Sequence, residues 1–93
     1  MPSERPYEIV VEDLARASLK RLDGPVREQV TQAIRRLGDN PHPGQARLRI
    51  GLDGVWRVRS GSWRILYRAE VSRERRRVVV LDLAHRSTIY RDL

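Results

Sequence analysis

The feature that most constrains the fold is a change in the spacing of apolar residues near the middle of the chain. Before the turn-rich segment 39–44 (DNPHPG), apolar side chains recur at helical spacing, and after it they alternate every second residue. A chain that combines the two periods must bury a helical stripe against one face of a sheet. The sequence therefore predicts an α+β fold.

One strand and two helices are expected before this loop. The segment 7–12 is rich in β-branched residues and indicates a strand. Asp13 is expected to cap a first helix, and Gly24-Pro25 separates it from a second. Gly38 is expected to cap the end of the second helix. The second helix has one apolar residue per turn, at Val26, Val30, Ile34 and Leu37.

Three strands are expected after the loop. Segments 55–59 and 63–69 flank Ser60-Gly61-Ser62, which is typical of a tight hairpin turn. The charged segment 73–77 predicts a second turn, and the continuous apolar run 78–84 predicts a central strand. The order β-α-α-β-β-β predicts a two-helix hairpin packed on a mostly antiparallel sheet. No linker divides the 93 residues, so a single domain spanning 1–93 is expected.

The net excess of positive charge lies entirely in the second half of the chain. Residues 1–46 carry seven basic and seven acidic side chains, whereas residues 47–93 carry twelve and five. Lys20 is the only lysine, so almost all of this charge is arginine. Arginine presents a planar fork that matches phosphate, which solubility alone does not require. The sequence therefore predicts a polyanion-binding surface, and the alternative is a solvated basic surface without a ligand.

Three arginines are expected to gather on the outer side of the hairpin. Strand alternation places Arg57 and Arg59 on one face, and Arg64 of the next strand joins them. A two-residue turn at Ser60-Gly61 pairs Arg57 with Arg64, whereas a turn at Gly61-Ser62 pairs Arg59 with Arg64. Both registers bring the same three side chains together.

Neighbouring arginines repel one another and lower stability unless an anion meets them. An anion site is therefore expected here, and the alternative is neutralisation by Asp53, Glu70 or Asp82. The aromatic residues of the hairpin face the other way. Trp56 and Trp63 are expected to build the core against the helices rather than to stack on bases.

The end of the chain adds groups that can transfer protons. His85-Arg86 follows the apolar strand, and Tyr90 lies one helical turn beyond Arg86 if the tail coils. His42, in a proline-flanked loop, is expected to be structural. The sequence has no nucleophile triad, paired carboxylates, Gly-rich phosphate loop or metal-ligand cluster. Any catalysis is therefore expected to use Arg, His and Tyr, with no metal and no cofactor.

Composition also bears on location. The chain has no cysteine, no apolar run of the roughly 18 residues that a bilayer requires, and no signal-peptide core. A cytoplasmic protein without membrane contact is expected.

At this point the sequence resembles a known family. The segment RLRIGLDGVWRVRSGSWRILYRAE followed by VVVLDLAHRSTIYRDL is similar to the RelE toxins of the RelE/ParE superfamily of bacterial toxin–antitoxin systems. The resemblance extends from Tyr7 to Tyr90. Its most specific parts are Leu48-Arg49, the W-R-V-R…W-R-I-L-Y hairpin and the final A-H-R-S-x-I-Y. It implies the RelE-like microbial RNase fold.

The resemblance implies a toxin of a type II system that cuts mRNA in the A site of the 30S ribosomal subunit and inhibits translation. In that family the RNA 2′-hydroxyl attacks the adjacent phosphate, giving a cyclic phosphate and a 5′-hydroxyl without metal. The implied partners are the ribosome with its mRNA and a cognate RelB-like antitoxin. Operator DNA is an implied partner only through the toxin–antitoxin complex.

The resemblance also assigns residues by position. Arg57 and Arg59 fall at the basic hairpin positions, Arg64 at the phosphate-binding arginine, Arg86 at the C-terminal arginine, and Tyr90 at the tyrosine that can stack on the substrate or orient it. The expected catalytic residues are Arg64, Arg86, Tyr90 and, on chemical grounds, His85, and the expected RNA-binding residues are Arg49, Arg57, Arg59 and Arg68. Better-known members carry lysines where Arg57 and Arg59 stand. Because arginine effectively cannot lose its proton, His85 becomes the first candidate for proton transfer and Tyr90 the second.

Two other functions are left open by the sequence. A ParE-like toxin would share the fold but would bind and poison DNA gyrase without nuclease activity. A toxin-like domain could instead serve mainly as half of a DNA-binding repressor complex. The arginine cluster together with His85, Arg86 and Tyr90 favours the nuclease.

Overall fold

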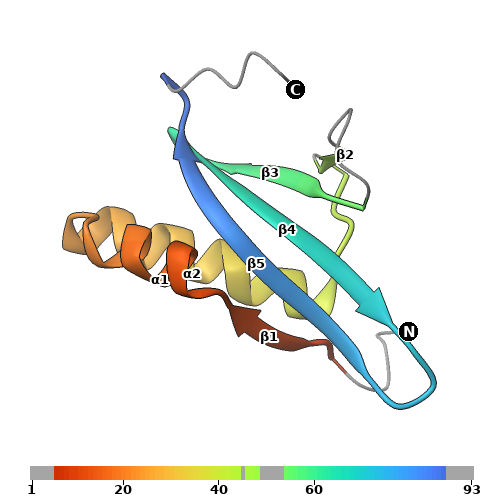
Figure 1. The fold of residues 1–93 in the computed structure, drawn as a ribbon. Helices are drawn as coiled ribbons and strands as arrows, with labels where there is room; N and C mark the ends of the chain where they lie inside the picture. Colours follow the sequence, from red (N-terminus) through yellow and green to blue (C-terminus); the bar gives the residue numbers. More distant parts are fainter. Residues whose placement is uncertain (1–5, 45, 49–53, 88–93) are drawn as a thin grey trace.

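The computed structural model describes residues 6–44, 46–48 and 54–87. The elements follow in the order β1 (Glu8–Val11), α1 (Asp13–Lys20), α2 (Gly24–Asp39), β2 (Arg47–Leu48), β3 (Trp56–Ser60), β4 (Trp63–Val71) and β5 (Arg76–His85). The strands form one sheet in the order β1-β5-β4-β3-β2, in which only β1 and β5 are parallel. The predicted α+β class and mostly antiparallel sheet are confirmed, and the two-residue strand β2 is an addition (Figure 1).

Both helices lie on one side of the sheet (Figure 1), where they cover its apolar face. The predicted stripe of α2 is buried there through Val30, Ile34 and Leu37. Burying one such side chain contributes about 1.5–3 kcal/mol. The sheet side of this core consists of Val58, Ile65, Tyr67, Val78, Val80 and Leu83. Trp56 and Trp63 pack against the core, as predicted. Neither described helix has the length and apolar character that crossing a bilayer requires.

Both predicted helix caps are wrong, because Glu12 rather than Asp13 is the N-cap of α1 and Gly38 does not cap α2. The helix continues through Asp39, and Asn40 is its C-cap. A Cβ atom on Gly38 would lie 3.2 Å from both Ile9 Cδ1 and the Tyr7 carbonyl oxygen, and the Tyr7 amide donates to the Gly38 carbonyl at 2.7 Å. The glycine therefore serves a close approach between α2 and the start of β1.

The β3–β4 hairpin adopts the second of the two expected registers. Ser60 pairs with Trp63 and Arg59 pairs with Arg64, so the turn residues are Gly61 and Ser62. Gly61 has a φ of 60°, a conformation that costs glycine little and other residues more. A glycine at the first of two central positions is typical of the hairpin turns that match strand twist.

Strand β5 contains an irregularity that changes which face its residues occupy. Tyr67 of β4 pairs with Val80, but its neighbour Leu66 pairs with Asp82, so Leu81 is an extra residue in β5. Such a bulge shifts the alternation of side chains by one residue. Val80 and Leu83 consequently both lie in the core, although they are three residues apart.

Candidate nucleic-acid interface

The face of the sheet turned away from the helices, here called the outer face, carries the predicted arginines. Residues opposite one another in an antiparallel pair project to the same face. Val58 and Ile65 form such a pair and lie in the core, so the adjacent pair of Arg59 and Arg64 lies on the outer face. Arg57 alternates with Val58 and joins them. These three residues, Arg57, Arg59 and Arg64, are called the arginine cluster.

No carboxylate within the described ranges lies at ion-pair distance from the arginine cluster. Glu70 instead pairs with Arg77, at 2.8 Å between Oε1 and Nε. Asp82 accepts hydrogen bonds from the Leu83 amide at 2.7 Å and from the Ser18 hydroxyl at 3.4 Å. Asp53 lies outside the described residues. Since Glu70 and Asp82 are engaged elsewhere, the repulsion within the cluster favours binding of an external anion.

A short apolar strip lies among these arginines. Leu66, Val79 and Ala84 are at most 8% exposed, yet they do not belong to the core beneath the helices. Arginine lays its methylene stem on such surface and keeps the guanidinium in water, which agrees with the partial burial of Arg57 and Arg64. A charged group on an apolar floor interacts more strongly with a phosphate than one surrounded by water.

The other arginine and tyrosine residues expected at the site are two RNA-binding residues, Arg49 and Arg68, and two catalytic ones, Arg86 and Tyr90. Arg68 lies two residues beyond Leu66 in β4, on the outer face, and it is exposed. Its Nη1 atom lies near Gly54, 3.7 Å from where a Cβ atom would stand. Arg49 and Tyr90 lie outside the described residues. Arg86 is exposed, and its backbone amide donates to the Ser62 carbonyl at 2.7 Å, which ties the end of β5 to the β3–β4 turn.

His85 does not share the outer face with the arginine cluster. It pairs with Trp63, whose side chain packs on the core, and the two rings meet edge to face with centroids 5.2 Å apart. Its Nδ1 atom lies 2.7 Å from the Ser87 hydroxyl and accepts from the Ser87 amide at 3.2 Å. In the neutral ring the proton then resides on Nε2.

The other aromatic and titratable groups of this region have structural roles. The Tyr67 hydroxyl donates to the Pro41 carbonyl at 2.6 Å, and burial raises the pKa of this phenol to about 12. His42 stacks on Trp56 with ring centroids 4.3 Å apart, in agreement with its expected structural role. Among the described residues, no group of three or more His, Asp or Glu side chains could hold a metal ion.

A groove of about 520 Å³ that the sequence did not predict lies between α2 and β3. Strand β2 pairs only with Trp56 and Arg57, so in the described chain Val58–Ser60 has no neighbouring strand on the side away from β4. Ala33 and Leu37 of α2 form the opposite wall, and Gln29 and Asn40 are among the polar lining residues. A free strand edge is a site where another chain can pair. Within the described residues β2 begins only at Arg47, which leaves this edge unpaired, and the sequence does not mark where β2 begins.

Comparisons with known proteins agree with this fold. The sequence matches the family model described as ParE toxin of type II toxin-antitoxin system, parDE, over residues 9–90. The structure is similar to the toxin–antitoxin complex RelBE2 from Mycobacterium tuberculosis, with 28% sequence identity, a TM-score of 0.76, and coverage of 95% of this chain and 100% of that chain. A comparison with curated proteins gives no significant match.

Two further structures support the fold alone. The archaeal RelE–RelB complex from Pyrococcus horikoshii has 18% identity and a TM-score of 0.72, covering 90% of this chain and 99% of that chain. A mutant of Escherichia coli RelE in the free state has 23% identity and a TM-score of 0.69, covering 88% and 85%. Since the family model matches most of the chain, the resemblance seen in the sequence is confirmed. The chain belongs to the ParE toxin family and is a type II toxin of the RelE/ParE superfamily.

Proposed function

We propose that this toxin is a metal-independent endoribonuclease that cuts mRNA in the A site of the 30S subunit and so inhibits translation. The observation that carries this proposal is the arginine cluster on the outer face. It has no carboxylate partner in the described part of the chain and lies beside an apolar strip. A surface of this kind suits an RNA backbone, whose phosphates supply the missing negative charge.

The reaction is an internal transfer. The 2′-oxygen of one nucleotide attacks the neighbouring phosphorus and loses its proton to a base, while the bond from phosphorus to the 5′-oxygen breaks. The products are a 2′,3′-cyclic phosphate and a 5′-hydroxyl, which takes a proton from an acid. Arg57 and Arg59 hold the RNA backbone. Arg64 and Arg86 stabilise the negative charge that builds on the phosphate, since preorganised cations lower that barrier most.

His85 is the proposed proton-transfer group, with Tyr90 as the second candidate. The hydrogen bonds to Ser87 occupy Nδ1 and leave Nε2 as the atom that would exchange a proton with the RNA. Because His85 lies across the sheet from the arginine cluster, the RNA must pass over the end formed by the β3–β4 turn. The hydrogen bond from the Arg86 backbone amide to the Ser62 carbonyl joins the end of β5 to this turn.

The partner proposed for the resting protein is a cognate RelB-like antitoxin. Both the Mycobacterium tuberculosis and the Pyrococcus horikoshii structures similar to this chain are toxin–antitoxin complexes. An acidic, partly disordered chain suits the basic half of this toxin, and an extended segment of it could pair with the free edge of β3 above the groove. Contact with operator DNA would then occur only through the toxin–antitoxin complex.

Expression of the protein alone tests this proposal. We expect growth arrest with transcripts cut on ribosomes, and rescue by the co-expressed antitoxin. Arg57→Ala/Arg59→Ala should bind ribosomes less tightly and lower the salt slope of binding by about 1.4–1.8, which corresponds to two phosphate contacts. Its thermal unfolding should resemble wild type because Arg59 is exposed and Arg57 partly so. Intact transcripts in cells that contain folded toxin would contradict the nuclease function.

A ParE-like gyrase poison is the second candidate. The family model that matches is that of ParE, and the His85 ring is not directed to the face of the arginine cluster. On this alternative, toxin expression would cause DNA breaks, and the purified protein would inhibit supercoiling by gyrase. Transcripts would remain intact. The two functions are therefore separated by the nucleic acid that is broken.

A further inference from the structure

A second basic surface lies at the end of the sheet opposite His85. Strand β3 reaches only Tyr67 of β4, so the β4–β5 hairpin continues without β3 beside it and projects past the other strands (Figure 1). Residues 71–75 are all exposed. These residues together with Arg76 are called the hairpin tip. At about 3.3 Å per residue, the length of β5 separates the tip from His85 by about 30 Å.

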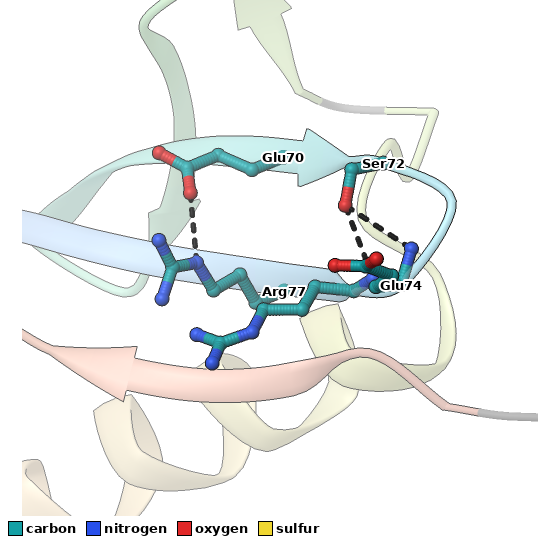
Figure 2. A network of polar contacts seen from close by, with 5 residues as sticks. Glu70, Ser72, Glu74 and Arg77 are labelled. Atoms are coloured by element: carbon teal, nitrogen blue, oxygen red, sulfur yellow. Dashed lines mark hydrogen bonds and ion pairs between the residues drawn. The ribbon is translucent and has the colours of Figure 1, made fainter.

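The backbone of the tip is held in one conformation by its own hydrogen bonds (Figure 2). The Ser72 hydroxyl accepts from the Glu74 amide at 3.3 Å and from the Arg75 amide at 3.1 Å. The Ser72 amide in turn donates to the Arg75 carbonyl at 2.8 Å. A turn that is already ordered loses little entropy when it binds a partner.

Two of the four arginines in segment 73–77 are engaged within the protein. Arg77 donates to Glu70 at 2.8 Å (Figure 2), and the Arg76 guanidinium lies 4.8 Å from the centre of the Tyr7 ring. Arg73 and Arg75 are exposed, and neither has an ion pair with any described carboxylate. The structure thus holds the neighbouring arginines in place and leaves these two free to bind an external anion.

The hairpin tip cannot act on an anion held by the arginine cluster. Arg57, the cluster member nearest to the tip, lies level with Asp82 of β5. About 20 Å along β5 therefore separates it from Arg76, more than twice the Debye length of about 8 Å at physiological salt. Charges that far apart on a surface are screened from each other. The two basic surfaces therefore need separate anions, either on one large partner or on two.

We propose that Arg73 and Arg75 bind the sugar-phosphate backbone of ribosomal RNA while the arginine cluster holds the mRNA. This proposal rests on the ribosome-dependent function proposed above. Arginine forks match phosphate oxygens. Val71, 65% exposed, is the only large apolar side chain of the tip, which is too little for the apolar centre of a protein interface. The chemistry therefore favours RNA over a protein partner.

Binding to ribosomes over a salt series tests the proposal, with Arg73→Gln/Arg75→Gln as the variant. Loss of two exposed ion pairs should weaken binding roughly 2- to 30-fold and lower the salt slope by about 1.4–1.8. The matched control is Arg27→Gln/Arg35→Gln, which removes the same charge from exposed positions of α2. The control should bind close to wild type. Circular dichroism melts establish that both variants are folded.

A direct probe of contact uses the absence of cysteine from the chain. Glu74→Cys gives a single thiol at the tip, to which an iron chelate that generates hydroxyl radicals can be attached. We expect strand cuts in ribosomal RNA close to the tip. The same probe combined with Arg73→Gln/Arg75→Gln should cut less at the same ligand concentration.

The outcomes separate this proposal from the function on which it rests. If wild type binds ribosomes and Arg73→Gln/Arg75→Gln binds equally well, or if the α2 control loses as much, the tip proposal is overturned alone. If wild type fails to bind ribosomes, both proposals are overturned. If the tip variant loses affinity for the acidic antitoxin while its ribosome binding is unchanged, the tip is a protein-binding surface and the RNA proposal is wrong.

Discussion

The two faces of this sheet differ in whether the protein itself covers and neutralises them. On the helix side, Val58, Ile65 and Val80 pack against α1 and α2, so the apolar surface of the sheet is buried within the protein. On the outer face, the arginine cluster lies beside apolar residues without a carboxylate partner in the described chain. The helix side is therefore covered by the protein's own helices, whereas the outer face carries positive charge that an external anion can neutralise. This difference predicts that substitutions on the helix side affect folding, while substitutions on the outer face affect binding.

The largest expected effect concerns catalysis, where His85 and the outer face must cooperate. His85→Gln keeps a polar side chain but cannot titrate, so single-turnover mRNA cleavage should fall about 10²- to 10⁴-fold while ribosome affinity stays near wild type. Arg64→Ala should reduce cleavage about 10²- to 10³-fold and also weaken binding, because the arginine contacts the phosphate before the reaction.

A pH–rate profile gives an independent check on this division. The wild-type profile should contain a limb that vanishes in His85→Gln. Cleavage by His85→Gln at nearly the wild-type rate would show that the reaction on the outer face does not require proton transfer by His85. Tyr90 would then be the leading candidate, or positioning and charge alone would carry the reaction.

The next effect is on stability, and it directly tests the difference between the helix side and the outer face of the sheet. Ile65 is fully buried on the helix side, so Ile65→Ala should lower the free energy of unfolding by about 2–5 kcal/mol. Arg59→Ala, on the neighbouring strand and the opposite face, should change it little or raise it slightly, since it removes repulsion from Arg64. Urea denaturation measures both. Comparable destabilisation by the two substitutions would mean that the outer face also belongs to the folding core.

Much of this arrangement could be predicted from the sequence because it depends on local periods. The spacing of Val30, Ile34 and Leu37 predicted the buried stripe of α2, and the alternation around Ser60-Gly61-Ser62 predicted the hairpin and its arginines. Two registers remained open there because both give the same faces. The structure has Gly61 in the turn at positive φ, which suits the register with Gly61 and Ser62 as turn residues.

The sequence could not reveal the side of the sheet on which His85 lies. Without the bulge at Leu81, the alternation from Val78 and Val80 would have placed His85 on the outer face beside the arginines. One extra residue in β5 reverses that assignment, and nothing in the apolar run 78–84 marks its position. Gly38 was misassigned for a similar reason, since its contact with Tyr7 is distant in sequence.

The smallest effect concerns Tyr67, a polar side chain on the helix side. Its hydroxyl donates to the Pro41 carbonyl, so Tyr67→Phe should lower the free energy of unfolding near pH 7 by about 0.5–1.5 kcal/mol. Burial raises the phenol pKa from 10.0 to about 12, so the unfolded chain ionises at lower pH than the folded protein. The stabilisation that results is present in full below pH 10 and is lost as the pH rises toward 12.

Over that interval the free energy of unfolding should fall by about 1.4 kcal/mol per pH unit more in wild type than in Tyr67→Phe. Urea denaturation from pH 9 upward measures the difference, and the contribution of every other group cancels because both proteins contain it. Parallel pH curves would mean that the phenol ionises as readily in the folded state as in the unfolded chain. Tyr67 would then be less buried than its position between α2, β3 and β5 indicates. The helix side of the sheet would in that case be partly open to water.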